Sequence, residues 1–133
     1  MRVDHAERAR ALVGTRFRPQ GRDRSGLDCV GLAMATSGMA ADAARRNYRL
    51  KGDHRREVEQ VLTRYFRRVG KREARAGDLL LLRVARDHLH LAVLTTAGFV
   101  HAHAGLGSVV ETPGAPEWPL IGVYRKRIRD RSG

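Results

Sequence analysis

Apolar and polar residues follow a helical spacing in the first half of the chain. Residues 4–13 place Ala and Leu between a capping aspartate and Gly14, which predicts a short helix. Residues 28–39 carry apolar side chains three to four positions apart after Asp28 at the N-cap position, so we expect a buried helix. Residues 53–70 predict another helix, whose buried face holds Val58, Val61, Leu62 and Tyr65.

After Gly70 the pattern changes to short apolar runs separated by turns, which is typical of β-strands. The expected strands are residues 78–84, 89–95, 98–102, 108–111 and 120–127. Helices followed by a meander of strands predict an α+β fold, with N-terminal helices (about 1–70) packed on a C-terminal antiparallel sheet of about five strands (71–128). A chain of 133 residues suits one domain, so we expect a single domain over 1–133.

The chain is strongly basic, with a net charge of +12, which favours polyanionic partners such as nucleic acid, an anionic cell-wall polymer or an acidic membrane surface. Almost all of the positive charge is arginine, and a GC-rich coding bias would also produce this preference for arginine over lysine. The alternative is therefore a solvated basic surface with no specific nucleic-acid partner. Aromatic residues make up only 5% of the chain, which disfavours a binder of single-stranded nucleic acid. No apolar run reaches the roughly 18 residues of a membrane span, and the N-terminus lacks a signal-peptide pattern, so we expect synthesis in the cytoplasm.

Cys29 is the only cysteine, and it lies in the first turn of the helix predicted after Asp28. Segment 15–27, which leads to it, has Pro19, Gly21 and Gly26 among charged residues and predicts a loop. Unpaired backbone N–H groups and the helix dipole favour a thiolate at that position, which makes Cys29 a candidate nucleophile. The alternative is a small buried apolar residue.

Four histidines lie on two of the predicted strands, at His88 and His90 and at His101 and His103. Residues two apart on a strand share a face, so a hairpin at residues 96–97 would gather all four imidazoles. They suit either a zinc site or a base with an orienting partner for Cys29, and some of them would suit a plain surface. Zinc is disfavoured because one cysteine is present and few carboxylates are near in sequence, so we expect no metal and no cofactor.

Several motifs together resemble the NlpC-type cell-wall cysteine peptidases, over residues from about 6 to 127. The motifs are Val13-Gly14-Thr15-Arg16-Phe17, Gly26-Leu27-Asp28-Cys29-Val30-Gly31-Leu32, Ala76-Gly77-Asp78-Leu79-Leu80, His90-Leu91-Ala92-Val93-Leu94 and Gly98-Phe99-Val100-His101-Ala102. The resemblance implies a papain-like fold in which Cys29 is the nucleophile, His90 the base and His101 the residue that orients the base.

The resemblance also implies hydrolysis of an amide bond in a peptidoglycan stem peptide, next to diaminopimelate and most often the γ-D-glutamyl bond. Two positions depart from the family pattern: Phe17 stands where the family commonly has Tyr, and Val30 stands where it has Ser. The residues expected near the substrate are Phe17, Asp28 and Val30, together with Arg16, Arg18 and Arg22, which would bind its carboxylates or else form a solvated loop.

The Asp-Cys-x-Gly-Leu form without a signal peptide resembles the subset of this family carried in phage-tail and gene-transfer-agent clusters. By analogy, a tail-like particle would deliver the protein to the cell wall or periplasm, and components of that particle would be its partners. Two other functions remain open, a non-catalytic tail-assembly or cell-wall-binding module on the same fold, and a basic nucleic-acid binder.

Overall fold

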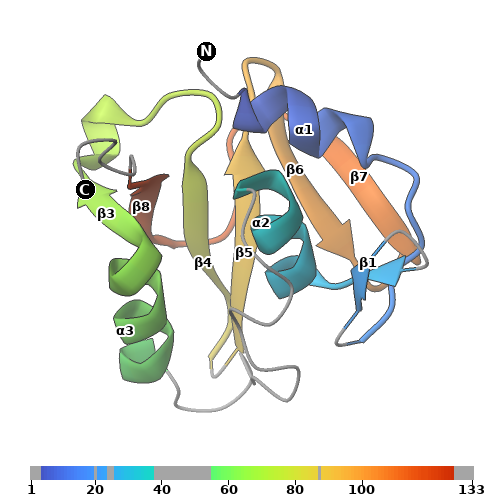
Figure 1. Cartoon of the computed structure of the whole chain (residues 1–133), viewed down its shortest axis with the longest axis horizontal. Coiled ribbons are helices and arrows are strands. Elements are labelled where there is room, and N and C mark those ends of the chain that lie inside the picture. Colours follow the sequence, from blue (N-terminus) through green and yellow to red (C-terminus); the bar gives the residue numbers. More distant parts are fainter. Residues whose placement is uncertain (1–3, 20, 24–25, 38–54, 87, 128–133) are drawn as a thin grey trace, which may run out of the picture.

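The computed structural model describes residues 4–19, 21–23, 26–37, 55–86 and 88–127 (Figure 1). The helices are α1 (His5–Ala11), α2 (Cys29–Ser37), α3 (Arg55–Tyr65) and the short 3-10 helix η1 (Lys71–Glu73). The strands are β1 (Arg22–Asp23), β2 (Gly26–Leu27), β3 (Phe66–Val69), β4 (Leu79–Ala85), β5 (His88–Leu94), β6 (Gly98–His103), β7 (Ser108–Pro113) and β8 (Leu120–Lys126).

The main sheet has six strands in the order β3-β8-β4-β5-β6-β7, and every neighbouring pair is antiparallel. The predicted α+β class is therefore confirmed. The five predicted strands appear as β4 to β8, with bounds within two residues of those expected. The expectation of a single domain over 1–133 stays a prediction.

Strand β3 is the one that the sequence pattern missed, because residues 66–70 were expected to continue the third helix. The helix ends at Tyr65, and β3 begins at the next residue and pairs with β8. In β3, Phe66 and Val69 are buried while Arg67 and Arg68 between them are exposed, a pattern that lacks strict alternation. Its partner lies more than fifty residues further along the chain, so a local pattern does not reveal the pairing.

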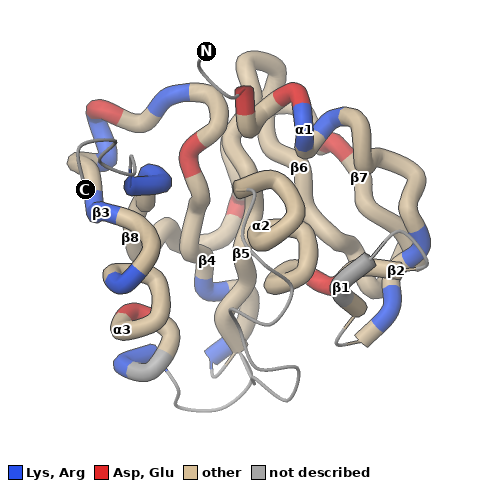
Figure 2. The backbone as a smooth tube through the Cα atoms, viewed as in Figure 1, with Lys and Arg blue, Asp and Glu red and all other residues tan. Residues whose placement is uncertain are grey.

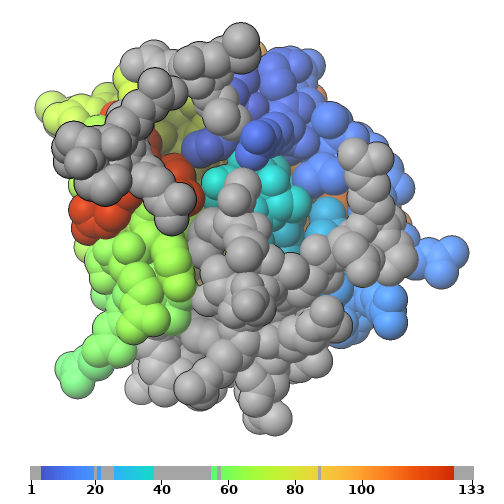
Figure 3. All heavy atoms as spheres, in the orientation of Figure 1, coloured from blue at the N-terminus to red at the C-terminus, as the bar shows by residue number. Residues whose placement is uncertain are grey.

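The two N-terminal helices begin where the capping residues predict. The carboxylate of Asp4 accepts a hydrogen bond from the backbone N–H of Glu7 at 3.1 Å, and Gly14 follows α1 with a positive φ of 95°. The expected loop at 15–27 contains the short hairpin of β1 and β2. Helices α1 and α2 contact each other and lie side by side in Figure 3. Residues 40–46, expected to extend or follow the helix after Asp28, and residues 47–52, expected to be irregular, lie outside the described residues.

The sheet separates two groups of buried apolar side chains. The helix-side core joins α2 and α3 to one face of the sheet, with Leu32, Val58, Leu81, Leu91 and Val100 among its members. The far-side core lies on the other face and is built by Val69, Leu80, Leu82, Ala92, Phe99 and Val123, with Trp118 packed against it. Alternate residues of β4 and β5 enter the two cores, as the period of a strand requires.

Charged residues concentrate away from the centre of the sheet. Figure 2 shows Lys and Arg along α3, β3 and the segment that follows β3. Asp78 is an exception, because it is only 2% exposed, and its carboxylate accepts two hydrogen bonds of 2.8 Å from the guanidinium of Arg125. None of the helices in the described ranges combines the length and apolar character that a membrane span needs.

Candidate active site

Cys29 is the first residue of α2, as the sequence predicts. The side chain of Asp28 accepts a hydrogen bond from the backbone N–H of Gly31 at 2.8 Å, and its carbonyl accepts one from Leu32 at 2.8 Å. Asp28 therefore caps the helix and fixes where it starts. Cys29 is half-buried and packs against the helix-side core. The thiol thus lies at the N-terminal end of a buried helix, where the helix dipole is positive.

The loop before Cys29 is held against α2 by backbone contacts. A Cβ atom at Gly31 would collide with the carbonyl of Gly21, so glycine permits this close approach. The carbonyl of Leu27 accepts from the N–H of Arg18 at 3.1 Å, and the N–H of Leu27 donates to the carbonyl of Arg16 at 2.9 Å. The arginine-rich loop is therefore tied to the segment that leads into Cys29.

The residues predicted to line a substrate site divide between surface and core. Arg16 and Arg18 are exposed, whereas Phe17 packs against the helix-side core. The backbone of Arg22 lies in β1, and its side chain is outside the described part of the structure.

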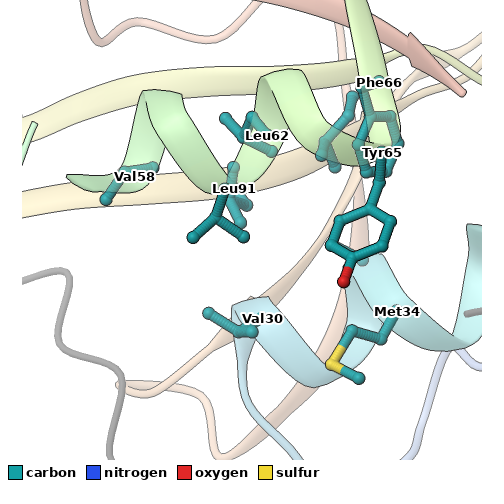
Figure 4. A pocket seen from close by; sticks show the side chains of 10 residues that line it. Val30, Met34, Val58, Leu62, Tyr65, Phe66 and Leu91 are labelled. Atoms are coloured by element: carbon teal, nitrogen blue, oxygen red, sulfur yellow. The ribbon is translucent and has the colours of Figure 1, made fainter. Parts of the chain in front are cut away.

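Val30 is buried, at 7% exposed, and does not lie on the surface of the loop. It lines an apolar cavity of about 40 Å³ between α2, α3 and the sheet. Figure 4 shows Val30 and Met34 of α2 across from Val58, Leu62 and Leu91. A serine hydroxyl at this position would need a hydrogen-bond partner among these apolar side chains, so valine suits the surroundings.

His90 on β5 and His101 on β6 form a direct contact. The distance from Nε2 of His90 to Nδ1 of His101 is 3.0 Å, which is a hydrogen bond between the two imidazoles. The rings meet edge to face, with centroids 5.2 Å apart and planes at 80°. Since Nε2 of His90 is engaged by His101, its Nδ1 is the ring nitrogen that remains for another proton partner.

The pairing of β5 and β6 explains why these two histidines meet. The strands pair only at Val93 with Val100 and at Leu94 with Phe99, so His90 and His101 lie beyond the paired residues. Continued regular pairing would place His90 opposite His103, yet its partner is His101. Helix α2 contacts both β5 and β6. The Cys29 helix therefore packs on the two strands that carry the histidine pair, while of the aromatic neighbours of the pair Phe99 belongs to the far-side core and Trp118 packs against it.

Two aromatic side chains pack against the pair, and the sequence analysis assigned neither of them to the site. The Trp118 ring lies 5.9 Å from the ring of His90 and 5.8 Å from that of His101, between centroids. The Phe99 ring lies 4.8 Å from that of His101. Trp118 is the only tryptophan of the chain and precedes the last strand, which is the single signal that sequence alone offers for it.

The remaining polar contacts around the pair involve Thr112 and His103. The Nε2 atom of His101 lies 3.2 Å from the hydroxyl of Thr112, a residue that the sequence analysis also missed. The backbone N–H of Leu106 donates to Nδ1 of His103 at 3.0 Å, so His103 caps the turn after β6. His101 and His103 have ring centroids 5.4 Å apart, whereas His88 has no ring contact of this kind among the described residues.

Both members of the pair are uncharged at neutral pH. Burial, with smaller contributions from charge on His101, His88 and His103, lowers the pKa of His90 to about 3. Burial also lowers the pKa of His101 to about 4, with a smaller contribution from His103. His101 is only 2% exposed, which agrees with a neutral ring. A neutral His90 keeps an acceptor lone pair, but a pKa of about 3 makes the ring a weak base unless a nearby negative charge raises it.

Metal binding has no geometric support in the described part of the chain. No group of three or more His, Cys, Asp or Glu side chains there is arranged to hold a metal ion.

The fold is that of NlpC/p60 domains. The solved structure of NlpC1 from Trichomonas vaginalis matches with a TM-score of 0.66 and 16% identity, over 92% of this chain and 42% of the other. The NlpC/p60 domain of the peptidoglycan hydrolase SagA matches with a TM-score of 0.57 and 18% identity, over 94% and 97% of the two chains. This chain spans less than half the length of NlpC1. No family model and no curated protein sequence matches it.

Proposed function

We propose that this protein is a cysteine peptidase that hydrolyses amide bonds in peptidoglycan stem peptides. The observation that carries the proposal is the neutral, hydrogen-bonded pair of His90 and His101 on the two strands against which the Cys29 helix packs. The likeness in fold to the NlpC/p60 domain of the peptidoglycan hydrolase SagA supports the substrate class.

In this mechanism Cys29 is the nucleophile and His90 the general base. The thiol proton passes to Nδ1 of His90 while the sulfur attacks the amide carbonyl, and backbone N–H groups at the start of α2 stabilise the oxyanion. The protonated His90 then gives the proton to the leaving amine, which leaves a thioester on Cys29. Water activated by His90 hydrolyses the thioester and restores the thiol. His101 accepts a hydrogen bond from Nε2 of His90 throughout and holds the ring in place.

Arginines in the loop before Cys29 are suited to an anionic substrate. Arg16 and Arg18 are exposed, and the backbone of their loop is hydrogen-bonded to Leu27, two residues before Cys29. Guanidinium groups bind carboxylates through two parallel hydrogen bonds, and a stem peptide with diaminopimelate offers several carboxylates. We propose the γ-D-glutamyl bond to diaminopimelate as the bond that is cleaved, with Arg22 as a further contact. Delivery to the cell wall by a phage-tail-like particle stays a prediction from the sequence motifs.

Digestion of purified diaminopimelate-type peptidoglycan tests this function, with wild type, Cys29→Ala and Cys29→Ser compared by mass spectrometry of the products. We expect the wild type to release stem-peptide fragments and both variants to release none, and the fragment masses identify the bond. Cleavage by the Cys29→Ala protein at the wild-type rate would reject Cys29 as the nucleophile.

Alkylation of the thiol separates a peptidase from a non-catalytic module on the same fold. We expect Cys29 to react rapidly with iodoacetamide at pH 7 and to react slowly in a His90→Ala variant, because His90 takes up the thiol proton. A slow thiol that ignores the His90 substitution, together with no peptidoglycan products, would favour a binding or assembly module.

A further inference from the structure

His101 has a defined partner on each of its two ring nitrogens. Nδ1 faces Nε2 of His90 at 3.0 Å, and Nε2 faces the hydroxyl of Thr112 at 3.2 Å. Thr112 lies on β7, opposite Phe99 of β6 in the strand register. Three side chains from β5, β6 and β7 therefore form one hydrogen-bonded row, His90, His101 and Thr112. Thr112 takes no part in the proposed peptidase mechanism.

The position of protons along this row is restricted when His90 is charged. A doubly protonated imidazole is a donor at both nitrogens, so Nε2 of His90 must donate to Nδ1 of His101. A neutral His101 that accepts at Nδ1 carries its own proton on Nε2. That N–H then points at Thr112, whose hydroxyl oxygen must accept it. The same arrangement leaves Nδ1 of a neutral His90 without a proton, as a base requires.

We propose that Thr112 is a positioning residue that holds the proton of His101 on Nε2 and so presents the Nδ1 lone pair to His90. The inference rests on the proposed function, because it gives His90 the role of base. Thr112 itself contacts neither the thiol nor the substrate in this scheme, and it acts through His101.

The surroundings of Thr112 make it suitable for this role. Its neighbour Glu111 accepts a hydrogen bond from the hydroxyl of Thr95 at 2.7 Å and forms an ion pair with Arg10 of α1 at 3.3 Å. These contacts fasten β7 to the β5–β6 hairpin and to α1 at the position next to Thr112. Since His101 is only 2% exposed, solvent does not readily replace a lost hydroxyl.

The test compares Thr112→Val, which keeps the shape and removes the hydroxyl, with Thr112→Ser, which keeps the hydroxyl. The first readout is the ¹⁵N spectrum of the imidazole nitrogens in full-length protein labelled at histidine, at pH 7. We expect the proton of His101 on Nε2 in the wild type and in Thr112→Ser, and a shift of population toward Nδ1 in Thr112→Val. Thermal unfolding of each variant serves as the control for the fold.

The second readout is peptidoglycan hydrolysis. For Thr112→Val we expect kcat to fall about tenfold with KM nearly unchanged, and for Thr112→Ser we expect recovery to within about threefold of wild type, since one buried neutral hydrogen bond is removed and restored. A merely structural role would lower the melting temperature and leave the tautomer unchanged.

Failure of this inference and failure of the proposed function are distinguishable. An active wild type whose His101 tautomer and kcat are unaffected by Thr112→Val would reject the role of Thr112 and leave the peptidase assignment intact. A wild type that shows the expected tautomers, with the shift in Thr112→Val, but does not cleave peptidoglycan would reject the proposed substrate and support the hydrogen-bonded row. A wild-type His101 with its proton on Nδ1 would overturn the inference outright.

Discussion

Asp78 and His101 are both buried beside the same sheet, but Asp78 is paired with a cation whereas His101 is neutral. Asp78 is 2% exposed and is paired with a cation, because Arg125 donates two hydrogen bonds to its carboxylate at 2.8 Å and the backbone N–H of Arg75 donates another at 2.9 Å. His101 is equally buried and forms no ion pair within the described part of the chain, so together with His90 it is uncharged instead.

The difference teaches which of the two groups is suited to chemistry. Both carboxylate oxygens of Asp78 already accept hydrogen bonds from β8 and from the turn before β4, so the group is committed to holding these segments together. The histidine pair uses Nε2 of His90 and both nitrogens of His101, and Nδ1 of His90 remains for a proton. The ion pair therefore stabilises the sheet, while the histidine pair can act as a base.

Removal of the base should give the largest effect. We expect His90→Ala to lower kcat/KM on peptidoglycan by about 10² to 10⁴, the usual contribution of a general base, with a smaller change in the free energy of unfolding. His88→Ala is the matched control, since it removes an imidazole two residues earlier on the same strand, and it should stay within about twofold of wild type. Full activity in His90→Ala together with loss of activity in His88→Ala would show that His88, and not His90, is the base.

Removal of one ion-pair partner should instead affect stability. Arg125→Ala leaves the buried carboxylate of Asp78 without its counter-ion, so we expect the free energy of unfolding to fall by about 3–5 kcal/mol, measured by urea denaturation. Hydrolysis per folded molecule should remain near wild type. Arg55→Ala, which breaks the exposed pair with Glu59 (2.9 Å), is the control and should cost about 1 kcal/mol or less. An equal loss of unfolding free energy in Arg125→Ala and Arg55→Ala would show that the buried ion pair contributes no more than the exposed one.

Loss of the orienting residue should be milder than loss of the base. We expect His101→Ala to lower kcat by about tenfold to a hundredfold, because His90 stays present but loses the acceptor for its Nε2 proton. His103→Ala serves for comparison, since that ring caps the turn through Leu106 and should be dispensable for hydrolysis. Steady-state kinetics of both proteins distinguish the two positions, and a more severe defect in His103→Ala would reverse the assignment.

The pH dependence of stability should carry the signature of the neutral pair. The ordinary histidine pKa is 6.5, and burial lowers that of His90 to about 3 and that of His101 to about 4. Below about pH 6.5 these two histidines bind protons in the unfolded chain but remain neutral in the folded protein. The free energy of unfolding therefore decreases as the pH falls from 6.5 toward 4.

We expect each histidine to contribute at most about 1.4 kcal/mol per pH unit to this slope. Urea denaturation at several pH values, in wild type and in His90→Gln, isolates the contribution because the carboxylates are common to both proteins. An identical slope in the two proteins would show that His90 titrates normally in the folded state.

Much of the fold follows from local sequence patterns. The helix after Asp28 begins at Cys29, and β4 to β8 lie within two residues of the predicted strands, because alternation and capping are properties of neighbouring residues. The two-residue spacing predicted that His88 and His90 share one strand face and that His101 and His103 share another. The structure brings His90 and His101 into contact. The assignment of catalytic roles to Cys29, His90 and His101 stays a proposal.

Other features depend on residues distant in sequence, which local patterns do not reveal. Strand β3 forms because β8 lies beside it, and Val30 is buried because side chains of α3 and of the sheet surround it. Trp118 and Thr112 meet the histidine pair from separate segments. The sequence by itself determined the order of elements and the residue types able to do chemistry. Only the tertiary structure decided which imidazole nitrogen faces which partner, because burial and hydrogen-bond geometry arise where separate strands converge.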